Sequence, residues 1–207
     1  MPPIVSEEYK TKMKKKIMET AFVCFAEKGF QNATMDDIVK NSGMSKGAIY
    51  NYFKSKDEIY IELMEQKTKE SIDKINENLS KFDLAEEKMR YLLNIYSHQI
   101  ERNPDWQNLI RVHIEFWLQS SRDENLKSML DDRMKNIYQK LIIDILELGK
   151  KNGEFPGNLD SKMISTLFWS IIDGISIYYG VMKDDYPYKQ MVEKAGEMIM
   201  KELVKKN

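Results

Sequence analysis

Hydrophobic residues recur along this chain of 207 residues at intervals of three and four, the spacing that places them on one side of an α-helix. No stretch shows the strict alternation of apolar and polar residues that indicates a β-strand. The pattern therefore predicts an all-α fold. After a loose tail at 1–9, the expected helices cover residues 10–28, 35–42, 46–53, 57–81, 84–102, 104–121, 123–152, 160–184 and 187–205.

Residues 34–56, TMDDIVKNSGMSKGAIYNYFKSK, predict two short helices joined by a tight turn. Thr34 can cap the first helix, and Asp37 follows three residues later as its acidic partner. Gly43 tolerates the left-handed backbone that a helix end often requires. Ser45 can then cap the second helix. The segment is expected to form a helix-turn-helix unit.

The second of these helices has one apolar and one polar side. Ile49 and Phe53 lie four residues apart and so share an inward side. A helix this short is not stable alone in water, so this side must pack on neighbouring helices. The outward side is expected to carry Lys46, Gly47, Tyr50 and Asn51. A cation, an aromatic hydroxyl and an amide beside a glycine suit entry into a DNA major groove.

Charge is distributed unevenly although the net charge of the chain is only −1. Residues 1–56 carry a net charge of +4, and the remaining residues carry −5. Five lysines gather at the start of the first helix, at 10, 12, 14, 15 and 16. A basic head on an acidic body is expected when only one end meets phosphate. The lysine cluster is either a solvated helix end or a phosphate-contacting arm.

Catalytic and metal-binding motifs are missing from the sequence. There is no HExxH zinc motif, no glycine-rich phosphate loop and no nucleophile elbow. Neither His98 nor His113 has Glu three residues earlier, which argues against a di-iron bundle. The single cysteine, Cys24, lies in an apolar stripe and is expected to be a buried small hydrophobe. We expect no enzyme activity, no cofactor, no metal and, with no leader segment visible, a cytoplasmic protein.

The segment 160–184 is apolar on all sides, with Asp173 as the one charge between Lys162 and Lys183. Its length could span a bilayer. The central carboxylate and several Ser and Thr favour a buried helix instead. We expect the chain's own helices to cover one side and a second copy the other, with Gly174 and Gly180 permitting close approach. The stripe of Met191, Ala195, Met198 and Ile199 in the last helix completes half of a four-helix dimer interface.

The residues around the predicted turn carry a resemblance to a known family. They are Gly29, Phe30, Ala33, Thr34, Met35, Ile38, Val39, the run 42–47 (SGMSKG) and the run 50–56 (YNYFKSK). This segment resembles the helix-turn-helix of the TetR (tetracycline-repressor-like) family of transcriptional regulators. The resemblance implies a DNA-binding domain at 1–56 and an effector-binding and dimerisation domain of six helices at 57–207. It also implies a homodimer through residues 160–205 that binds double-stranded DNA at an inverted-repeat operator.

Resemblance and helix geometry together assign the DNA contacts to Thr34, Ser45, Lys46, Gly47, Tyr50, Tyr52 and Lys56. Lys46 is expected to donate to guanine acceptors and Tyr50 to contact a base edge or a thymine methyl. Thr34 and Ser45 stand at helix N-termini, which favour phosphate. Tyr52 either contacts phosphate or packs beside Phe53.

The resemblance also implies an effector site inside the body. The candidates are Tyr96, Trp106, His113, Phe116, Trp117, Trp169, Asp173 and Tyr178, with Glu115 as a further polar neighbour. An aromatic-lined site suits a small apolar effector, and a carboxylate favours a cationic one. The alternative is that these aromatics are simply core. The expected function is a repressor released from its operator by this effector; the alternative is a helical protein-interaction module that does not read DNA.

Overall fold

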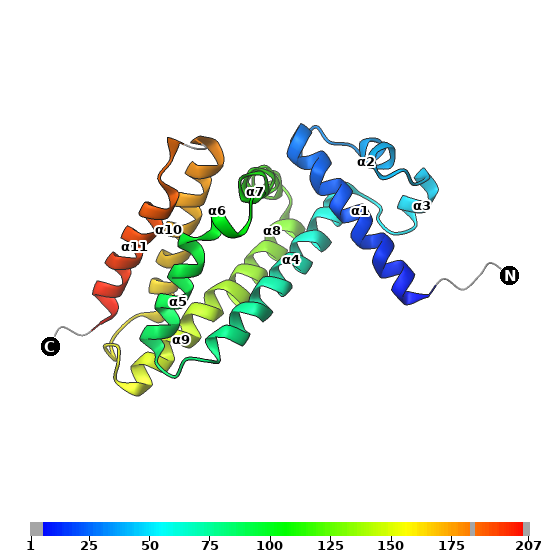
Figure 1. Cartoon of the computed structure of the whole chain (residues 1–207). Coiled ribbons are helices and arrows are strands. Elements are labelled where there is room, and N and C mark those ends of the chain that lie inside the picture. The colour runs from blue at the N-terminus through cyan, green and yellow to red at the C-terminus, as the bar shows by residue number, and fades with distance from the viewer. Residues whose placement is uncertain (1–5, 183–184, 205–207) are drawn as a thin grey trace. The chain divides into compact units, whose positions relative to one another are not determined.

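The computed structural model describes residues 6–182 and 185–204, and all regular structure within them is helical. The bounds are α1 Glu7–Lys28, α2 Met35–Ser42, α3 Lys46–Tyr50, α4 Lys56–Leu79, α5 Ala85–Ser97, α6 Gln99–Arg102, α7 Trp106–Ser120, α8 Glu124–Arg133, η1 Met134–Gln139, α9 Lys140–Asn152, α10 Ser161–Met182 and α11 Tyr188–Leu203 (Figure 1). The predicted all-α fold is confirmed. The ends of the expected interface region at 183, 184 and 205, like residues 1–5 of the expected tail, lie outside the described residues.

The first helix begins earlier than its periodicity predicts. Ser6 caps α1 by accepting a hydrogen bond from the Tyr9 N–H at 3.2 Å, and Glu7 and Glu8 form the first turn. Acidic residues in a first turn complement the positive end of the helix dipole. The expected tail at 7–9 is therefore helical, because a capping residue and favourable charges outweigh the absence of an apolar stripe there.

The chain divides into two compact units, Met1–Lys74 and Ile75–Asn207. The division falls within α4 rather than at the boundary of 56/57 expected from the sequence. One reason is that the first turns of α4 pack on the head: the Tyr60 ring lies 5.4 Å from the Phe30 ring, and Ile59 is fully buried.

The first unit has a small apolar core built by α1, α2, α3 and the start of α4. Its fully buried side chains are Ile17, Ala21, Cys24, Phe25, Phe30, Ile38, Ile49, Phe53 and Ile59. Phe25 and Phe30 meet edge to face at 5.0 Å between ring centroids. Cys24 is buried as predicted, and its sulfur accepts a hydrogen bond from the Asn41 amide. This core fixes the angle at which α3 is presented.

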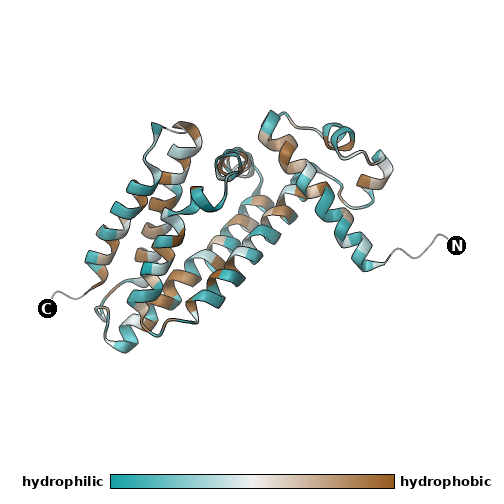
Figure 2. Ribbon diagram, in the orientation of Figure 1, coloured by the Kyte–Doolittle hydropathy of each residue, from teal (hydrophilic) through white to brown (hydrophobic). Residues whose placement is uncertain are grey.

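The second unit is a helical bundle in which α5 packs on α9 and α11, and α10 packs on α7, η1, α9 and α11. Brown hydrophobic stripes on these helices face their neighbours in Figure 2. Two of the predicted helices are interrupted. His98 separates α5 from α6, and its Nδ1 lies 3.0 Å from the Asn94 carbonyl oxygen. The π-helical segment η1 joins α8 to α9, and such segments are frequent at functional sites.

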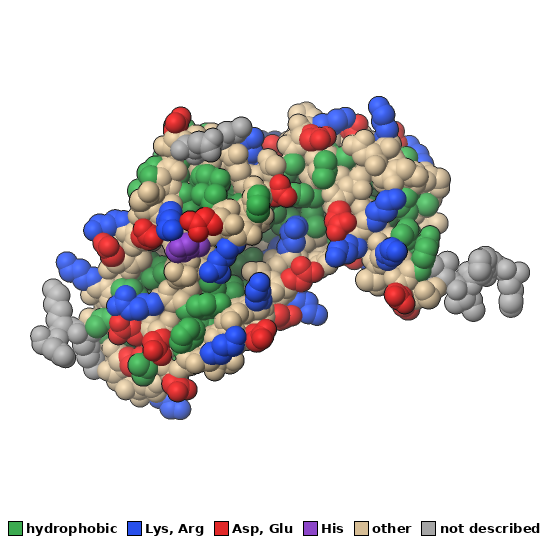
Figure 3. All heavy atoms as spheres, in the orientation of Figure 1, with side chains coloured by type: hydrophobic (Ala, Val, Ile, Leu, Met, Phe, Trp, Pro, Cys, Tyr) green, Lys and Arg blue, Asp and Glu red, His purple; other side chains and the backbone are tan. Residues whose placement is uncertain are grey.

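The helix α10 is long and apolar enough to cross a membrane, as a core helix of a soluble protein also is. Its buried side comprises Ser161, Ser165, Phe168, Trp169, Ile172, Ile175, Ser176 and Gly180. Large apolar residues remain exposed on its other side, namely Met163, Leu167, Ile177, Tyr178, Val181 and Met182. Exposed hydrophobic side chains of the protein appear green in Figure 3. Within the described part of the chain, the bundle thus covers one side of the helix and leaves the other exposed.

The two glycines of α10 differ in their surroundings. A β-carbon at Gly180 would lie 2.8 Å from Cγ2 of Ile110, and Arg111 Nε donates to the Gly180 carbonyl at 2.9 Å. Gly180 therefore serves the packing of α7 on α10 within one chain, contrary to the expectation that it lets a second copy approach. Gly174 has open space where its β-carbon would be.

Candidate nucleic-acid interface and effector site

The turn between α2 and α3 is held by the local contacts that the sequence predicts. Thr34 and Asp37 form a capping box: the Asp37 N–H donates to Thr34 Oγ1 at 3.2 Å, and the Thr34 N–H donates to Asp37 Oδ2 at 3.0 Å. A hydrogen bond from Lys28, followed by those from Thr34, lowers the pKa of Asp37 to about 2. Gly43 ends α2 in the left-handed region at φ 66°, and Ser45 Oγ accepts from the Ala48 N–H at 3.2 Å.

The helix α3 ends at Tyr50, three residues before the expected Phe53. The Ile49 carbonyl accepts from the N–H groups of both Tyr52 and Phe53, at 2.9 and 3.0 Å, so the chain leaves the helix through a tighter turn. Ile49 and Phe53 are nevertheless both fully buried. The predicted inward side is therefore present, although it is built from a helix and a turn rather than from one helix.

The outward side of α3 carries the polar groups that the sequence places there. The Lys46 side chain is 61% exposed, and its Nζ lies 2.7 Å from Asp36 Oδ1 of α2 and 5.9 Å from the centroid of the Tyr50 ring. The hydrogen bond with Asp36 raises the pKa of Lys46, so this side chain is a cation at neutral pH. Gly47 and Asn51 are exposed, and Tyr50 is half-buried.

Lys56 has a structural role that its position in the motif does not reveal. Its Nζ donates to the carbonyl oxygens of Phe30, Gln31 and Ala33 at 2.7, 2.8 and 3.0 Å, and it lies 4.9 Å from the centre of the Phe30 ring. An ammonium has three donors, and all three are used here. Lys56 therefore closes the loop between α1 and α2, which argues against its expected contact with phosphate.

Tyr52 lines a groove of the first unit that the sequence does not predict. The groove has a volume of about 840 Å³ and lies between α1, the end of α3 and the middle of α4; its lining includes Tyr9, Lys10, Lys14, Met18, Asn51 and Glu62. Tyr52 is half-buried there, so its exposure is compatible both with a phosphate contact and with packing beside Phe53. Lys10 pairs with Glu7 and Lys14 with Glu62, each at 2.7 Å. These two lysines of the basic cluster are thus engaged by carboxylates.

Some of the predicted effector residues converge in the second unit. The Trp169 ring meets Tyr96 at 5.5 Å and Tyr138 at 5.0 Å, both edge to face. Burial raises the pKa of Tyr96, and electrostatic interaction with the nearby Tyr138, Tyr188 and Asp173 side chains raises it further. The four aromatic side chains, Tyr96 of α5, Tyr138 of η1, Trp169 of α10 and Tyr188 of α11, form one cluster beside the Asp173 carboxylate. The sequence does not predict that Tyr138 and Tyr188 belong to this cluster, because only the packing of η1 and α11 on the other helices brings them there.

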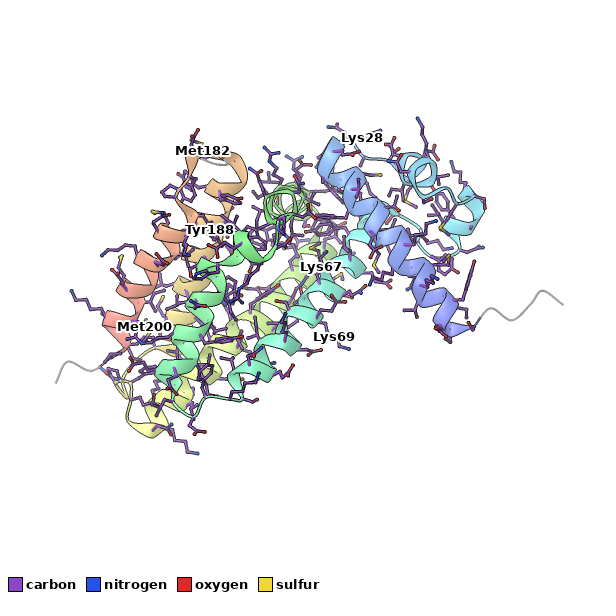
Figure 4. The ribbon with its side chains drawn as sticks, viewed as in Figure 1. Lys28, Lys67, Lys69, Met182, Tyr188 and Met200 are labelled. Atoms are coloured by element: carbon purple, nitrogen blue, oxygen red, sulfur yellow. The ribbon has the colours of Figure 1, made fainter. Side chains whose placement is uncertain are left out.

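Three buried polar atoms near this cluster have no hydrogen-bond partner among the described residues: Trp106 Nε1, Trp169 Nε1 and the Tyr188 hydroxyl. Burial is also the cause that raises the pKa of Asp173 to about 6. Figure 4 shows Tyr188 at the start of α11. Buried polar groups normally have partners, so such a concentration of unpaired ones marks a candidate ligand site.

The other predicted effector residues differ in their surroundings. Tyr178 is 63% exposed and stacks on Tyr186 at 5.8 Å, so it does not line the interior as expected. Phe116 is 1% exposed and belongs to the core. His113 pairs with Trp117 on α7 at 4.4 Å, and burial followed by the charge of Arg133 lowers the His113 pKa to about 4. His113 is therefore neutral at pH 7.

The structure of the first unit defines a class of protein. A capped helix with its apolar side buried and its polar side exposed, following a glycine turn, is a helix-turn-helix unit of the kind that binds DNA. The family model described as "Bacterial regulatory proteins, tetR family" matches residues 17–63, and that described as "YsiA-like protein, C-terminal region" matches residues 64–202. The chain belongs to the TetR family.

Individual relatives agree with this assignment. The uncharacterized HTH-type transcriptional regulator YfiR of Bacillus subtilis is 29% identical over 192 residues, which cover 89% of this chain and 90% of that protein. QacR of Staphylococcus aureus, an HTH-type transcriptional regulator, is 30% identical over 79% of this chain and 84% of its own. The solved structure of the fatty acid degradation regulator FadR of Bacillus halodurans is 26% identical and matches with a TM-score of 0.78 over 90% of this chain and 94% of that one.

These findings establish what the protein does in general terms. It is a DNA-binding transcriptional regulator of the ligand-responsive repressor type, as predicted. The family is one of regulators rather than of enzymes. Among the residues that the structure describes, no group of three His, Cys, Asp or Glu side chains is placed to hold a metal ion.

Proposed function

We propose that the protein is a cytoplasmic homodimer that binds an inverted-repeat operator through α3, with Lys46 and Tyr50 contacting base edges. The single observation that carries this proposal is the exposed Lys46 ammonium beside Gly47, which has no side chain to keep the helix backbone away from DNA. Thr34 and Ser45 at the helix starts and Tyr52 at the groove are then the phosphate neighbours. Lys56 is left out because its donors are already used.

The dimer is proposed to form through α10 and α11. Both helices expose large apolar side chains that a soluble monomer rarely leaves in water: Met163, Leu167, Ile177, Tyr178, Val181 and Met182 on α10, and Met191 and Met198 on α11. A twofold axis through this surface would make the contact self-complementary and give two identical heads. The operator would then consist of two half-sites in opposite orientation.

The effector is proposed to bind in the second unit, near Tyr96, Trp106, Trp169 and Asp173, and to be a small apolar or cationic molecule. The convergence of aromatic rings with unpaired polar atoms supports this location. Release of the operator would follow if the effector binds more tightly to a conformation of the dimer that holds the heads out of register with DNA.

Selection of bound fragments from random-sequence duplexes, with the full-length protein, tests the proposal. We expect an inverted repeat whose half-site centres lie about one helical turn apart. Affinity for it should fall steeply with salt, because phosphate contacts release counterions. Recovery of no preferred sequence, with affinity independent of salt, would instead support a helical module that binds another protein.

A further inference from the structure

The carboxylate of Asp173 is an unusual feature of the second unit because it is largely removed from water without a compensating charge among the described residues. It stands on α10 among residues that are otherwise apolar or neutral from Met163 to Met182. Among the described residues it makes no ion pair and no hydrogen bond, and burial raises its pKa. An ionised carboxylate in such surroundings is unfavourable unless a cation or a donor accompanies it.

Unpaired donors stand on the elements around this carboxylate. Trp169 Nε1 belongs to the same helix one turn earlier, Trp106 Nε1 belongs to α7, and the Tyr188 hydroxyl belongs to α11. The Tyr188 hydroxyl lies next to Ser176 and Trp106 without a hydrogen bond of normal geometry to either, and the Asp173 charge is near enough to contribute to its raised pKa. An indole N–H can only donate, so two of these atoms require an acceptor.

The aromatic rings of the cluster complete the surroundings. Tyr96 and Tyr138 both meet the Trp169 ring edge to face, and Tyr96 lies near the charge of Asp173. Aromatic faces attract organic cations, most strongly where water is excluded. Tyr138 is supplied by the π-helical segment η1, whose extra residue per turn changes the direction of its side chains relative to an α-helix.

Resting on the effector role proposed above, we propose that the effector is an organic cation that also carries a hydrogen-bond acceptor. Its ammonium group lies against Asp173 and the faces of Tyr96, Tyr138 and Trp169. Its acceptor oxygen receives hydrogen bonds from the unpaired indole N–H groups and the Tyr188 hydroxyl. A pure hydrocarbon would leave these donors unpaired, and a ligand with a carboxylate at this place would be repelled by Asp173.

A matched pair of probes tests the ligand class with the full-length protein. Acetylcholine offers a quaternary ammonium and an ester carbonyl; its carbon isostere, with a tert-butyl group in place of trimethylammonium, keeps the shape and the acceptor but has no charge. Binding is followed by isothermal titration calorimetry and by quenching of tryptophan fluorescence. We expect acetylcholine to bind at least about tenfold more tightly than the isostere, because the cation pairs with the Asp173 carboxylate and the aromatic faces, whereas the isostere leaves the carboxylate without a counter-charge.

Two variants locate the preference. Asp173→Asn should reduce the preference for the charged probe and leave binding of the isostere unchanged, whereas Asp132→Asn, which alters an exposed carboxylate of α8, should behave as the unmodified protein. Equal affinity for the two probes, a preference that is undiminished in Asp173→Asn, or no binding of acetylcholine at about millimolar concentration would each overturn the inference. Binding of the selected operator is measured on the same preparations: if it is retained, only the ligand class falls, and if it is lost as well, the proposed function falls.

Discussion

Lys46 Nζ of α3 lies 2.7 Å from Asp36 Oδ1 of α2, so in the free protein the cation proposed to contact bases is already engaged by a carboxylate. Both side chains are largely exposed, at 61% and 72%. Water and salt screen such a pair, and its contribution to stability is small. Breaking this ion pair so that Lys46 can contact DNA would therefore cost little free energy. While the pair is formed, the Asp36 carboxylate weakens the attraction of Lys46 to phosphate at random positions on DNA.

Replacing Lys46 by Ala should reduce sequence discrimination. We expect affinity for the selected operator to fall by about tenfold or more, with a much smaller loss on a scrambled duplex, because the side chain is proposed to read a base edge. Fluorescence anisotropy with both duplexes at one salt concentration measures the difference. Lys69→Ala, which removes an exposed lysine of α4 away from the helix-turn-helix, serves as the control. An unchanged ratio between the two duplexes would contradict the role of Lys46.

Replacing Asp36 by Asn should act in the opposite direction. Removal of a negative charge beside Lys46 should tighten binding to every duplex by a few-fold at low salt, with the gain shrinking as salt screens the interaction. Anisotropy titrations at two salt concentrations check this expectation. A gain restricted to the operator would show that Asp36 takes part in reading the sequence.

Replacing Lys56 by Met should destabilise the first unit. Three carbonyl oxygens, of Phe30, Gln31 and Ala33, lose their shared donor. The expected loss is about 2 kcal/mol, the usual scale for hydrogen bonds donated by a charged group. Thermal unfolding followed by circular dichroism measures it, with the exposed Lys40→Met as the control. Unchanged stability combined with weaker DNA binding would contradict this structural role and indicate that Lys56 contacts phosphate.

Replacing Gly149 by Ala should destabilise the second unit, because the new β-carbon would overlap the Phe155 ring. The Phe155 N–H also donates to the Gly149 carbonyl at 3.1 Å, so the ring cannot move away freely. Overpacking of this kind costs about 1–3 kcal/mol. Gly157→Ala, where the β-carbon meets open space, is the matched control. Equal melting temperatures for the two variants would refute the close contact.

Replacing Asp173 by Asn should stabilise the protein at neutral pH. Burial raises the pKa of this carboxyl from 3.8 to about 6, so the folded protein holds the proton more tightly than the unfolded chain. Stability therefore falls as pH rises from about 4 to about 6, and the penalty is complete above that range. Tyr96 and Tyr188, which face Asp173, stay protonated throughout.

The expected gain is on the order of 2 kcal/mol at about pH 7.5, and it should become small at about pH 4. Chemical unfolding of both proteins at the two pH values measures this. A gain of the same size at both would mean that the ionisation of Asp173 is not its source.

Sequence reasoning succeeded where the determining contacts are local. The capping box of Thr34 and Asp37, the left-handed Gly43 and the cap at Ser45 each depend on atoms within three residues, so their residue types were sufficient. The exposure of Tyr178 could also have been predicted. It follows Trp169 by nine residues, a spacing that places the two side chains on opposite sides of a helix.

Contacts between distant residues were beyond such reasoning. The carbonyl partners of Lys56 precede it by 23 to 26 residues, and no local rule connects them. Tyr138 and Tyr188 join the aromatic cluster only because η1 and α11 pack on α10 and its neighbours. The interruptions at His98 and η1 leave the apolar periodicity intact, so the sequence pattern predicted one helix in each place.

The helix α4 begins with Lys56, whose ammonium donates hydrogen bonds to the α1–α2 loop, and it continues without a break past Lys74 into the second unit. Stretching or compressing an α-helix would break its own hydrogen bonds, whereas moving it whole breaks none. An axial displacement of the whole helix would therefore also displace Lys56 and the three carbonyl oxygens that accept hydrogen bonds from its Nζ. The segment that leads into α2 would move with them, so the position of α2 depends on where α4 begins.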